Sequence, residues 1–178
     1  AQKIVLDICD VVAEINPTLK INIATNGTVY NKRVRHIMDN CNLHINISID
    51  SLDRQRYSDI RINGNLDVVL KNFAVFNKYC KENDRVLSVM VNPMNNNWRE
   101  MREFVDFCDT HDVILWFNTI KYPEHLAIWN LGSSKLTHVY NTMKDNLSNI
   151  PNTSLNYKVF EHLVDKQIGN WLLDSYVE

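Results

Sequence analysis

One segment limits the possible folds of this chain more than any other, and it spans residues 44–50 (HINISID). Isoleucine occupies every second position, and the positions between are polar. Because side chains alternate across a β-strand, a strand here has one isoleucine face and one face formed by Asn46, Ser48 and Asp50. The fold must therefore bury the first face and give the second a polar environment.

Three other segments also have the composition of short strands, and helical patterns lie between them. The four predicted strands, each rich in isoleucine or valine, cover residues 20–25, 44–50, 85–91 and 113–118. Apolar residues recur at helical spacing in 31–40, 65–80 and 97–110, and Asn97 and Glu100 are predicted to cap the last helix. This alternation predicts an α/β fold built from parallel βαβ units.

The predicted strands share a polar face, which an open sheet covered by helices on both sides would not have. Besides residues 46, 48 and 50, the side chains of that face are Asn22, Ala24, Asn26, Ser88, Met90, Asn92, Trp116 and Asn118. A sheet that curls around a polar hollow accounts for them. It would bring the polar strand ends to one rim, where barrel enzymes place their sites. An antiparallel sheet with one wet face is the alternative.

Helices are predicted after the last strand. Tyr122-Pro123 ends the strand pattern, and a helix capped by Ser133 or Ser134 follows. A second helix is predicted from about residue 154, with Gly169 as its weak point. We expect residues 1–131 to form the βαβ portion and residues 132–178 to form a C-terminal helical extension packed on it.

Composition argues against several classes of function. With 178 residues and a formal net charge of −2, the chain fits one globular domain and offers no basic field for nucleic acid. No apolar run approaches the roughly 20 residues that a membrane span needs, so we expect no membrane partner and a cytoplasmic location. The four cysteines lie far apart, which predicts reduced, buried side chains and no metal site in this chain.

Several short motifs follow one another in a recognisable order. They are residues 23–28 (IATNGT), 47–51 (ISIDS), 57–61 (YSDIR), 91–93 (VNP) with Asn97 and Glu100, and 119–126 (TIKYPEHL). From about residue 20 to residue 131, this order resembles the radical S-adenosylmethionine (radical SAM) enzymes, and in particular the subgroup related to anaerobic sulfatase-maturing enzymes.

The resemblance implies that the chain is the C-terminal portion of a (β/α)6 partial TIM barrel. In that family a CxxxCxxC loop after the first strand binds a 4Fe-4S cluster, and S-adenosylmethionine is cleaved reductively to a 5'-deoxyadenosyl radical that abstracts hydrogen from the substrate. This sequence opens within an amphipathic helix and contains no such loop. We therefore expect cluster ligands upstream, an oxidoreductase as the full-length protein, an inactive fragment, and an unknown small-molecule or peptide substrate.

The resemblance assigns cofactor contacts to five residues and a catalytic role to none. Ser48 would hydrogen-bond the cofactor, and Arg61 would pair with its methionine carboxylate. Asp50 would accept a hydrogen bond from the ribose or orient Arg61, while Asn26 and Asn92 would reach the same rim as neutral donors and acceptors. The residues alone leave other roles open: a satisfied hydroxyl for Ser48, a solvated side chain for Arg61, and a turn cap for Asp50.

Two other functions also fit the sequence. A metal-dependent isomerase or lyase on a barrel would need several carboxylates or imidazoles, and only Asp50, with Glu124 and His125 further out, qualifies. A non-catalytic binding scaffold is the second alternative. If early strands are missing, the strand at 20–25 has an unpaired edge, which predicts self-association of the chain.

Overall fold

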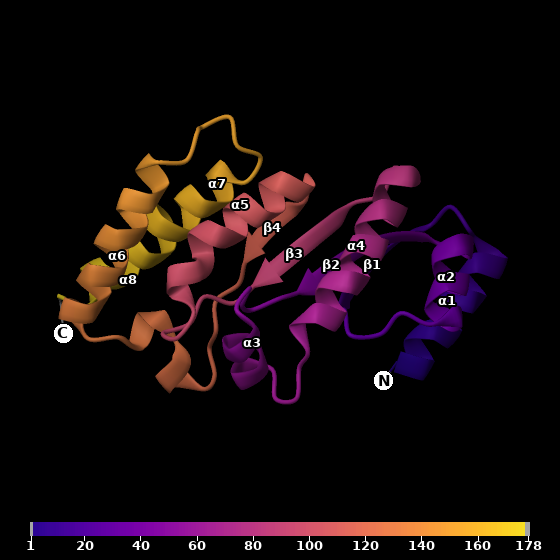
Figure 1. The fold of residues 1–178 in the computed structure, drawn as a ribbon, viewed down its shortest axis with the longest axis horizontal. Helices are drawn as coiled ribbons and strands as arrows, with labels where there is room; N and C mark the ends of the chain where they lie inside the picture. The colour runs from indigo at the N-terminus through magenta and orange to yellow at the C-terminus, as the bar shows by residue number, and fades with distance from the viewer. Residues whose placement is uncertain (1, 177–178) are drawn as a thin grey trace.

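The computed structural model describes residues 2–176, which form a four-stranded parallel sheet with helices packed on it (Figure 1). The strands are β1 (Lys20–Thr25), β2 (Asn42–Ser48), β3 (Leu87–Val91) and β4 (Ile114–Phe117). They lie in the order β1-β2-β3-β4, so neighbours along the chain are neighbours in the sheet. The prediction of parallel βαβ units is confirmed, and the antiparallel alternative is wrong.

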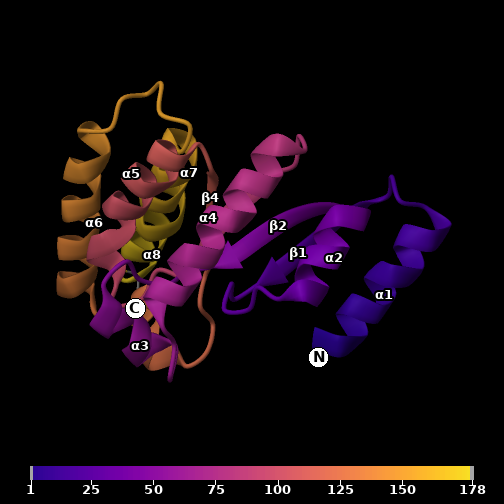
Figure 2. The same ribbon diagram turned by 45° about the vertical axis from the view of Figure 1, so that its right-hand side comes forward.

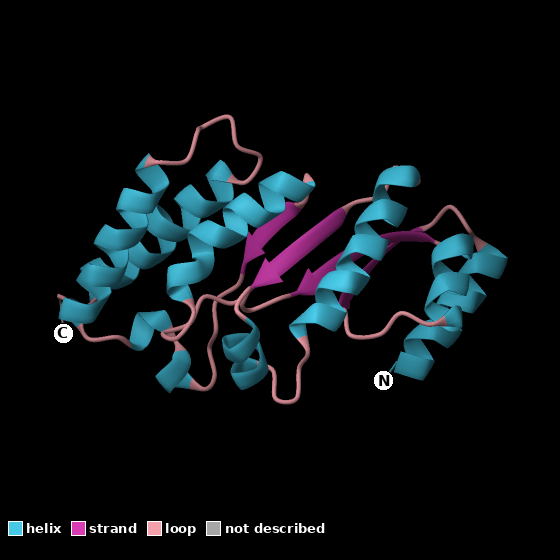
Figure 3. Ribbon diagram, in the orientation of Figure 1, coloured by secondary structure: helices cyan, strands magenta, loops and turns pink. Residues whose placement is uncertain are grey.

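Eight α-helices of the described residues accompany the sheet (Figure 3). They are α1 (Gln2–Ile15), α2 (Lys32–Asn40), α3 (Arg54–Ile60), α4 (Leu66–Glu82), α5 (Met101–His111), α6 (Ser133–Ser148), α7 (Tyr157–Glu161) and α8 (Gly169–Asp174). Short 3₁₀ turns cover Trp98–Glu100, Glu124–Leu126 and Ile128–Asn130, and a π-helical stretch, His162–Ile168, joins α7 to α8. Within residues 2–176, every helix is too short or too polar to cross a bilayer.

The isoleucine face of β2 is the core side of the sheet. Ile45, Ile47 and Ile49 are 5%, 0% and 0% exposed. Helix α4 lies over this face (Figure 2), and the turn after β1 meets it there. Gly27 in that turn has a φ of +69°, and a Cβ on it would lie 2.9 Å from the Ile47 Cγ2 atom. Only glycine therefore fits both the backbone angle and the space.

The opposite face carries the predicted polar side chains, and it remains accessible. Register places Ser48 beside Met90, and Met90 beside Trp116. Trp116 is 50% exposed, whereas Leu115 on the other face is fully buried. The strands all point toward the side of the sheet where α3 lies, so their polar C-terminal ends form one rim there (Figure 1).

The two edges of the sheet differ. No strand within residues 2–176 pairs with the outer side of β1. At the other edge, the side chain of Asn156 takes the place of a further strand: its Oδ1 accepts from the Leu115 N–H (2.7 Å), and its Nδ2 donates to the Val113 carbonyl (3.0 Å). Asn156 is 2% exposed. The side chain of Asn156 therefore satisfies backbone groups at the β4 edge, whereas the β1 edge has no paired strand among residues 2–176.

Two predicted helix caps are wrong. Asn97 and Glu100 form no capping box, because the Asn97 Oδ1 accepts from the Met94 N–H (2.6 Å) and Glu100 turns to another loop. Gly132, rather than a serine, is the N-cap of α6, and no side chain caps this helix. Gly169 lies where the π-helical stretch gives way to α8, within the helix predicted from about residue 154.

His44 on β2 gives the fold a pH dependence. Its Nδ1 accepts a hydrogen bond from the Val86 N–H (3.1 Å), and burial, with the nearby charges of Lys20 and Arg85, lowers the pKa of the imidazole. A histidine of the unfolded chain has a pKa of about 6.5. Below that pH the unfolded chain takes up a proton that the folded chain resists, so the free energy of unfolding falls as the pH decreases.

We expect His44→Gln to show a shallower loss of stability than the wild type below about pH 6.5. Urea unfolding curves at several pH values would measure the slope for both proteins. An identical slope in the two would contradict the lowered pKa of His44.

Candidate cofactor-binding site

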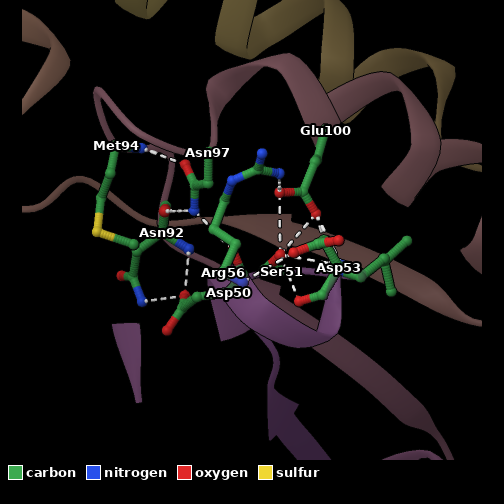
Figure 4. Close-up of polar contacts among 9 residues, drawn as sticks. Asp50, Ser51, Asp53, Arg56, Asn92, Met94, Asn97 and Glu100 are labelled. Carbon is green, nitrogen blue, oxygen red and sulfur yellow. Dashed lines mark hydrogen bonds and ion pairs between the residues drawn. The ribbon is translucent and has the colours of Figure 1, made fainter. Parts of the chain in front are cut away.

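The carboxylate of Asp50 is the centre of the rim, two residues beyond the end of β2 (Figure 4). Asp50 is only 3% exposed, and both of its oxygens are used. Oδ2 accepts from Arg61, through Nε at 2.8 Å and Nη2 at 2.6 Å. Oδ1 accepts from the backbone N–H and the side-chain Nδ2 of Asn92, at 2.9 and 2.8 Å. Asp50 thus orients Arg61 and does not cap the turn.

Arg61 lies at the C-terminal end of α3, a helix that was not predicted. Asp53 is the N-cap of α3, where its Oδ1 accepts from the Arg56 N–H (2.8 Å). The Arg61 side chain is 32% exposed, and within residues 2–176 its Nη1 makes no hydrogen bond. Asp50 occupies one edge of the guanidinium, so the Nη1/Nη2 edge is available to a second carboxylate.

Asparagines from two loops, those after β3 and β4, extend the rim beyond Asp50. Asn118, just after β4, donates through Nδ2 to the Asn92 Oδ1 (3.1 Å), and Asn92 donates to Asp50. Asn97, which is 1% exposed, donates to the Asp50 carbonyl (2.7 Å) and to the Asn92 carbonyl (3.0 Å). The strand ends of β2, β3 and β4 are therefore joined by side-chain hydrogen bonds. Both polar groups of the Asn92 side chain are engaged within this chain of bonds.

A second buried carboxylate, that of Glu100, supports the start of α3. Glu100 is 4% exposed and accepts from the Ser51 hydroxyl (2.9 and 2.8 Å) and from the Leu52 N–H (2.7 Å). It also pairs with Arg56, and that hydrogen bond raises the pKa of the Arg56 guanidinium (Figure 4). Glu100 therefore links the 3₁₀ turn before α5 to the loop that leads into α3.

Two polar side chains on the open face lack partners among residues 2–176. Ser48 on β2 makes no side-chain hydrogen bond there, and the Oδ1 of Asn46 is enclosed without a donor. A buried acceptor without a donor costs free energy, and the protein around the Asn46 Oδ1 leaves it inaccessible. Asn26 is apart from this set, because its Oδ1 accepts from the N–H and the hydroxyl of Thr28 (3.2 and 2.8 Å).

The cysteines lie in the core. All four are free and buried: Cys9, Cys41, Cys80 and Cys108. Burial raises the pKa of Cys80 to about 11 and that of Cys108 to about 12, which keeps these thiols protonated at neutral pH. Across residues 2–176, no three side chains of His, Cys, Asp or Glu converge as metal ligands would. The described residues therefore do not fit an iron-sulfur cluster.

The five predicted contact residues do not form one group. Asp50 is hydrogen-bonded to both Arg61 and Asn92. Ser48 is the last residue of β2, two residues before Asp50, and Asn26 belongs to a separate turn. Sequence reasoning missed the organising roles of Asn97 and Glu100. Their polar side chains at the start of a predicted helix have the pattern of a cap. The bonds that instead join them to the loop after β2 reach Asp50, 47 residues before Asn97, and Ser51, 49 residues before Glu100.

Two curated proteins are similar to this chain, and both are named GTP 3',8-cyclase. The protein of Lactiplantibacillus plantarum is 28% identical over 144 residues, which is 79% of this chain and 43% of the relative. The protein of Limosilactobacillus fermentum is 25% identical over 126 residues, which is 71% of this chain and 36% of the relative. The chain thus spans less than half the length of the curated relatives it matches. No protein-family model matches it.

GTP 3',8-cyclase is a radical SAM enzyme, so this distant similarity agrees with the family resemblance of the motifs. Neither relative is named as a sulfatase-maturing enzyme, and that subgroup stays a prediction.

Proposed function

We propose that the full-length protein is a radical SAM enzyme and that the rim at Ser48 and Arg61 binds S-adenosylmethionine. The observation that carries the proposal is the geometry of Arg61, whose guanidinium is held on one edge by the buried Asp50. The similarity to two radical SAM enzymes supports the choice of cofactor.

Arg61 fits the carboxylate of a bound amino acid. Its two remaining N–H groups at the Nη1/Nη2 edge match a carboxylate in the planar, two-point manner that arginine favours. Asp50 restricts the side chain before the cofactor arrives, so little conformational entropy is lost on binding. In this proposal Asp50 and Asn92 are positioning residues, because their polar atoms are already used to hold Arg61 and one another.

Ser48 completes the proposed contact surface. The free hydroxyl of Ser48 both donates and accepts, which suits the ribose or the amino-acid portion of the cofactor. Asn26 would contribute only its Nδ2, since its Oδ1 is used by Thr28.

The cluster would come from a part of the protein outside these residues. When bound, the cluster supplies the electron that cleaves the sulfonium to a 5'-deoxyadenosyl radical. We propose that a CxxxCxxC segment upstream provides its ligands and that further strands pair with the open edge of β1, completing a (β/α)6 partial barrel. Without those strands, the same edge would pair with a second copy of the chain, and light scattering that finds a monomer at high concentration would contradict this.

Substrate, subgroup and location belong to the proposal as well. The two relatives are named for action on GTP, which makes a nucleotide the first substrate to test, although a peptide substrate fits the proposed sulfatase-related subgroup. We propose residues 132–178 as a C-terminal helical extension packed on the barrel, and we propose a cytoplasmic location. A metal-dependent lyase has little support, because both oxygens of Asp50 are engaged and the 3₁₀ turn with Glu124 and His125 is exposed. A non-catalytic scaffold would retain the fold without cofactor binding.

The test is cofactor affinity in the full-length protein. We expect Arg61→Ala to weaken S-adenosylmethionine binding by about tenfold or more, as the loss of charged hydrogen bonds implies. The affinity of Arg61→Lys should lie between those of the wild type and Arg61→Ala, because lysine keeps the positive charge but cannot bind a carboxylate at two points. Calorimetry beside an iron assay measures both affinity and cluster content.

Arg54→Ala is the matched control. Arg54 lies on the same helix and pairs with Asp67 at the surface, so its removal should change neither reading. Unchanged affinity in Arg61→Ala, with iron content equal to the wild type, would rule out the proposed role of Arg61.

A further inference from the structure

A cleft of about 530 Å³ lies outside the rim, between the 3₁₀ turn that precedes α5 and the first turns of α6. Its polar and aromatic lining consists of Asn95, Trp98, Arg99, Ser134, Lys135 and His138. None of the lining residues carries a carboxylate. Within residues 2–176, neither Arg99 nor Lys135 forms an ion pair. The cleft therefore concentrates positive charge that no acidic side chain of its lining balances.

Stacking holds the charged side of the cleft in place. The guanidinium carbon of Arg99 lies 4.3 Å from the centre of the Trp98 ring. The ring of His138 meets the same indole edge-on, with ring centres 5.7 Å apart. These contacts restrict the Arg99 and His138 side chains before any ligand arrives, which lowers the entropic cost of binding one.

Trp98 supplies an uncommitted donor. The residue is 4% exposed, and its indole N–H donates to no group of residues 2–176. The nitrogen is also absent from the polar atoms that the protein encloses completely, so it retains some exposure to solvent, and Trp98 is one of the residues that line the cleft. A tryptophan N–H in such a place usually has a hydrogen-bond partner.

Helix α6 adds backbone donors at the same place. It begins at Ser133 after Gly132, and no side chain caps its first turn. The Lys135 N–H already donates to the Gly132 carbonyl (2.9 Å), which leaves the N–H groups of Ser133 and Ser134 without a partner within the helix, and an anion satisfies such groups. Ser134 and Lys135 in this turn line the cleft. The start of α6 therefore borders the same cleft as Trp98 and Arg99.

We propose that this cleft binds the phosphate group of a small organic phosphate. A tetrahedral, multiply charged anion accepts from several directions, which matches an arginine, a lysine, an indole and a helix end placed around one space. The volume exceeds that of a bare phosphate, and Leu131 and Val139 provide an apolar wall for the organic part. The site is separate from the rim at Asp50, so it stands or falls independently of the proposed cofactor binding.

The test is calorimetric titration of the full-length protein with inorganic pyrophosphate, with citrate as a carboxylate anion of comparable charge. We expect saturable binding of pyrophosphate, a loss of at least about tenfold in the double variant Arg99→Gln/Lys135→Gln, and a smaller loss in Trp98→Phe, which keeps a ring and removes the N–H. The far-ultraviolet circular dichroism spectrum should match that of the wild type, which shows that the double variant is folded.

The matched control is Lys71→Gln/Lys166→Gln, which removes two exposed charges elsewhere. It should bind pyrophosphate as the wild type does. Equal weakening in the control would mean general charge attraction, and equal affinity for citrate would mean that the cleft does not select phosphate. Either result, or no saturable binding by the wild type, would overturn the proposal.

Discussion

Glu100→Ala is expected to lower the free energy of unfolding by about 2–4 kcal/mol, because donors in the protein interior lose their acceptor. Glu100 is 4% exposed, and its carboxylate is the acceptor for the Ser51 hydroxyl, the Leu52 N–H and the Arg56 guanidinium. Alanine leaves the partly buried Leu52 N–H without an acceptor and the Ser51 hydroxyl with only the longer hydrogen bond to the Asp53 carbonyl (3.2 Å). Urea unfolding followed by circular dichroism would measure the loss.

Two further variants test whether this loss comes from the buried contacts. Glu103→Ala on α5 removes an exposed glutamate and should change stability by no more than about 0.5 kcal/mol. Glu100→Gln retains an acceptor for Leu52 and loses the charge opposite Arg56, so an intermediate loss is expected. If Glu100→Ala unfolded like Glu103→Ala, the support of α3 by Glu100 would be wrong.

Asp50→Asn is expected to cost about 3 kcal/mol of stability and, in the full-length protein, to weaken S-adenosylmethionine binding. The carboxylate accepts from Arg61 on one oxygen and from Asn92 on the other. An amide offers one acceptor in their place, so either Arg61 or Asn92 would face an N–H donor. Arg61 would then lose its fixed orientation.

A double-mutant cycle separates positioning from direct contact. If Asp50 acts through Arg61, Asp50→Asn should have no further effect on cofactor affinity in an Arg61→Ala background. Calorimetry on the two single variants and the double variant gives the coupling. Additive losses would show instead that Asp50 touches the cofactor itself, as a ribose contact would require.

The sheet was predictable because its signal is local. Alternation of isoleucine with Asn46, Ser48 and Asp50 determines which face of the strand is buried, and this pattern survives in the burial of Ile45, Ile47 and Ile49. The ends of this strand differ from the prediction. Strand β2 covers Asn42–Ser48, so each end lies two residues before the corresponding end of the predicted range, 44–50. The start of β2 depends on pairing with β1 and its end on pairing with β3, and the alternation encodes neither.

The rim was predictable only in part. The strand ends at Asp50 and Asn92 follow from the parallel sheet, because carboxyl ends of neighbouring strands meet at one edge. Helix α3 was missed, since its charged residues lack a broad apolar stripe and Tyr57 is its one buried side chain. The local pattern predicts a helix cap at Glu100. Its hydrogen-bond partners Ser51 and Arg56 lie 49 and 44 residues away in sequence, so the local pattern does not reveal them.

The most direct test of the central claim is the release of 5'-deoxyadenosine. The full-length protein, with its iron-sulfur cluster intact, is incubated anaerobically with S-adenosylmethionine and a strong reductant, and the products are separated by chromatography. The account predicts that the wild type forms 5'-deoxyadenosine and that Arg61→Ala forms far less at limiting cofactor. No 5'-deoxyadenosine from a wild-type protein with full iron content would contradict it.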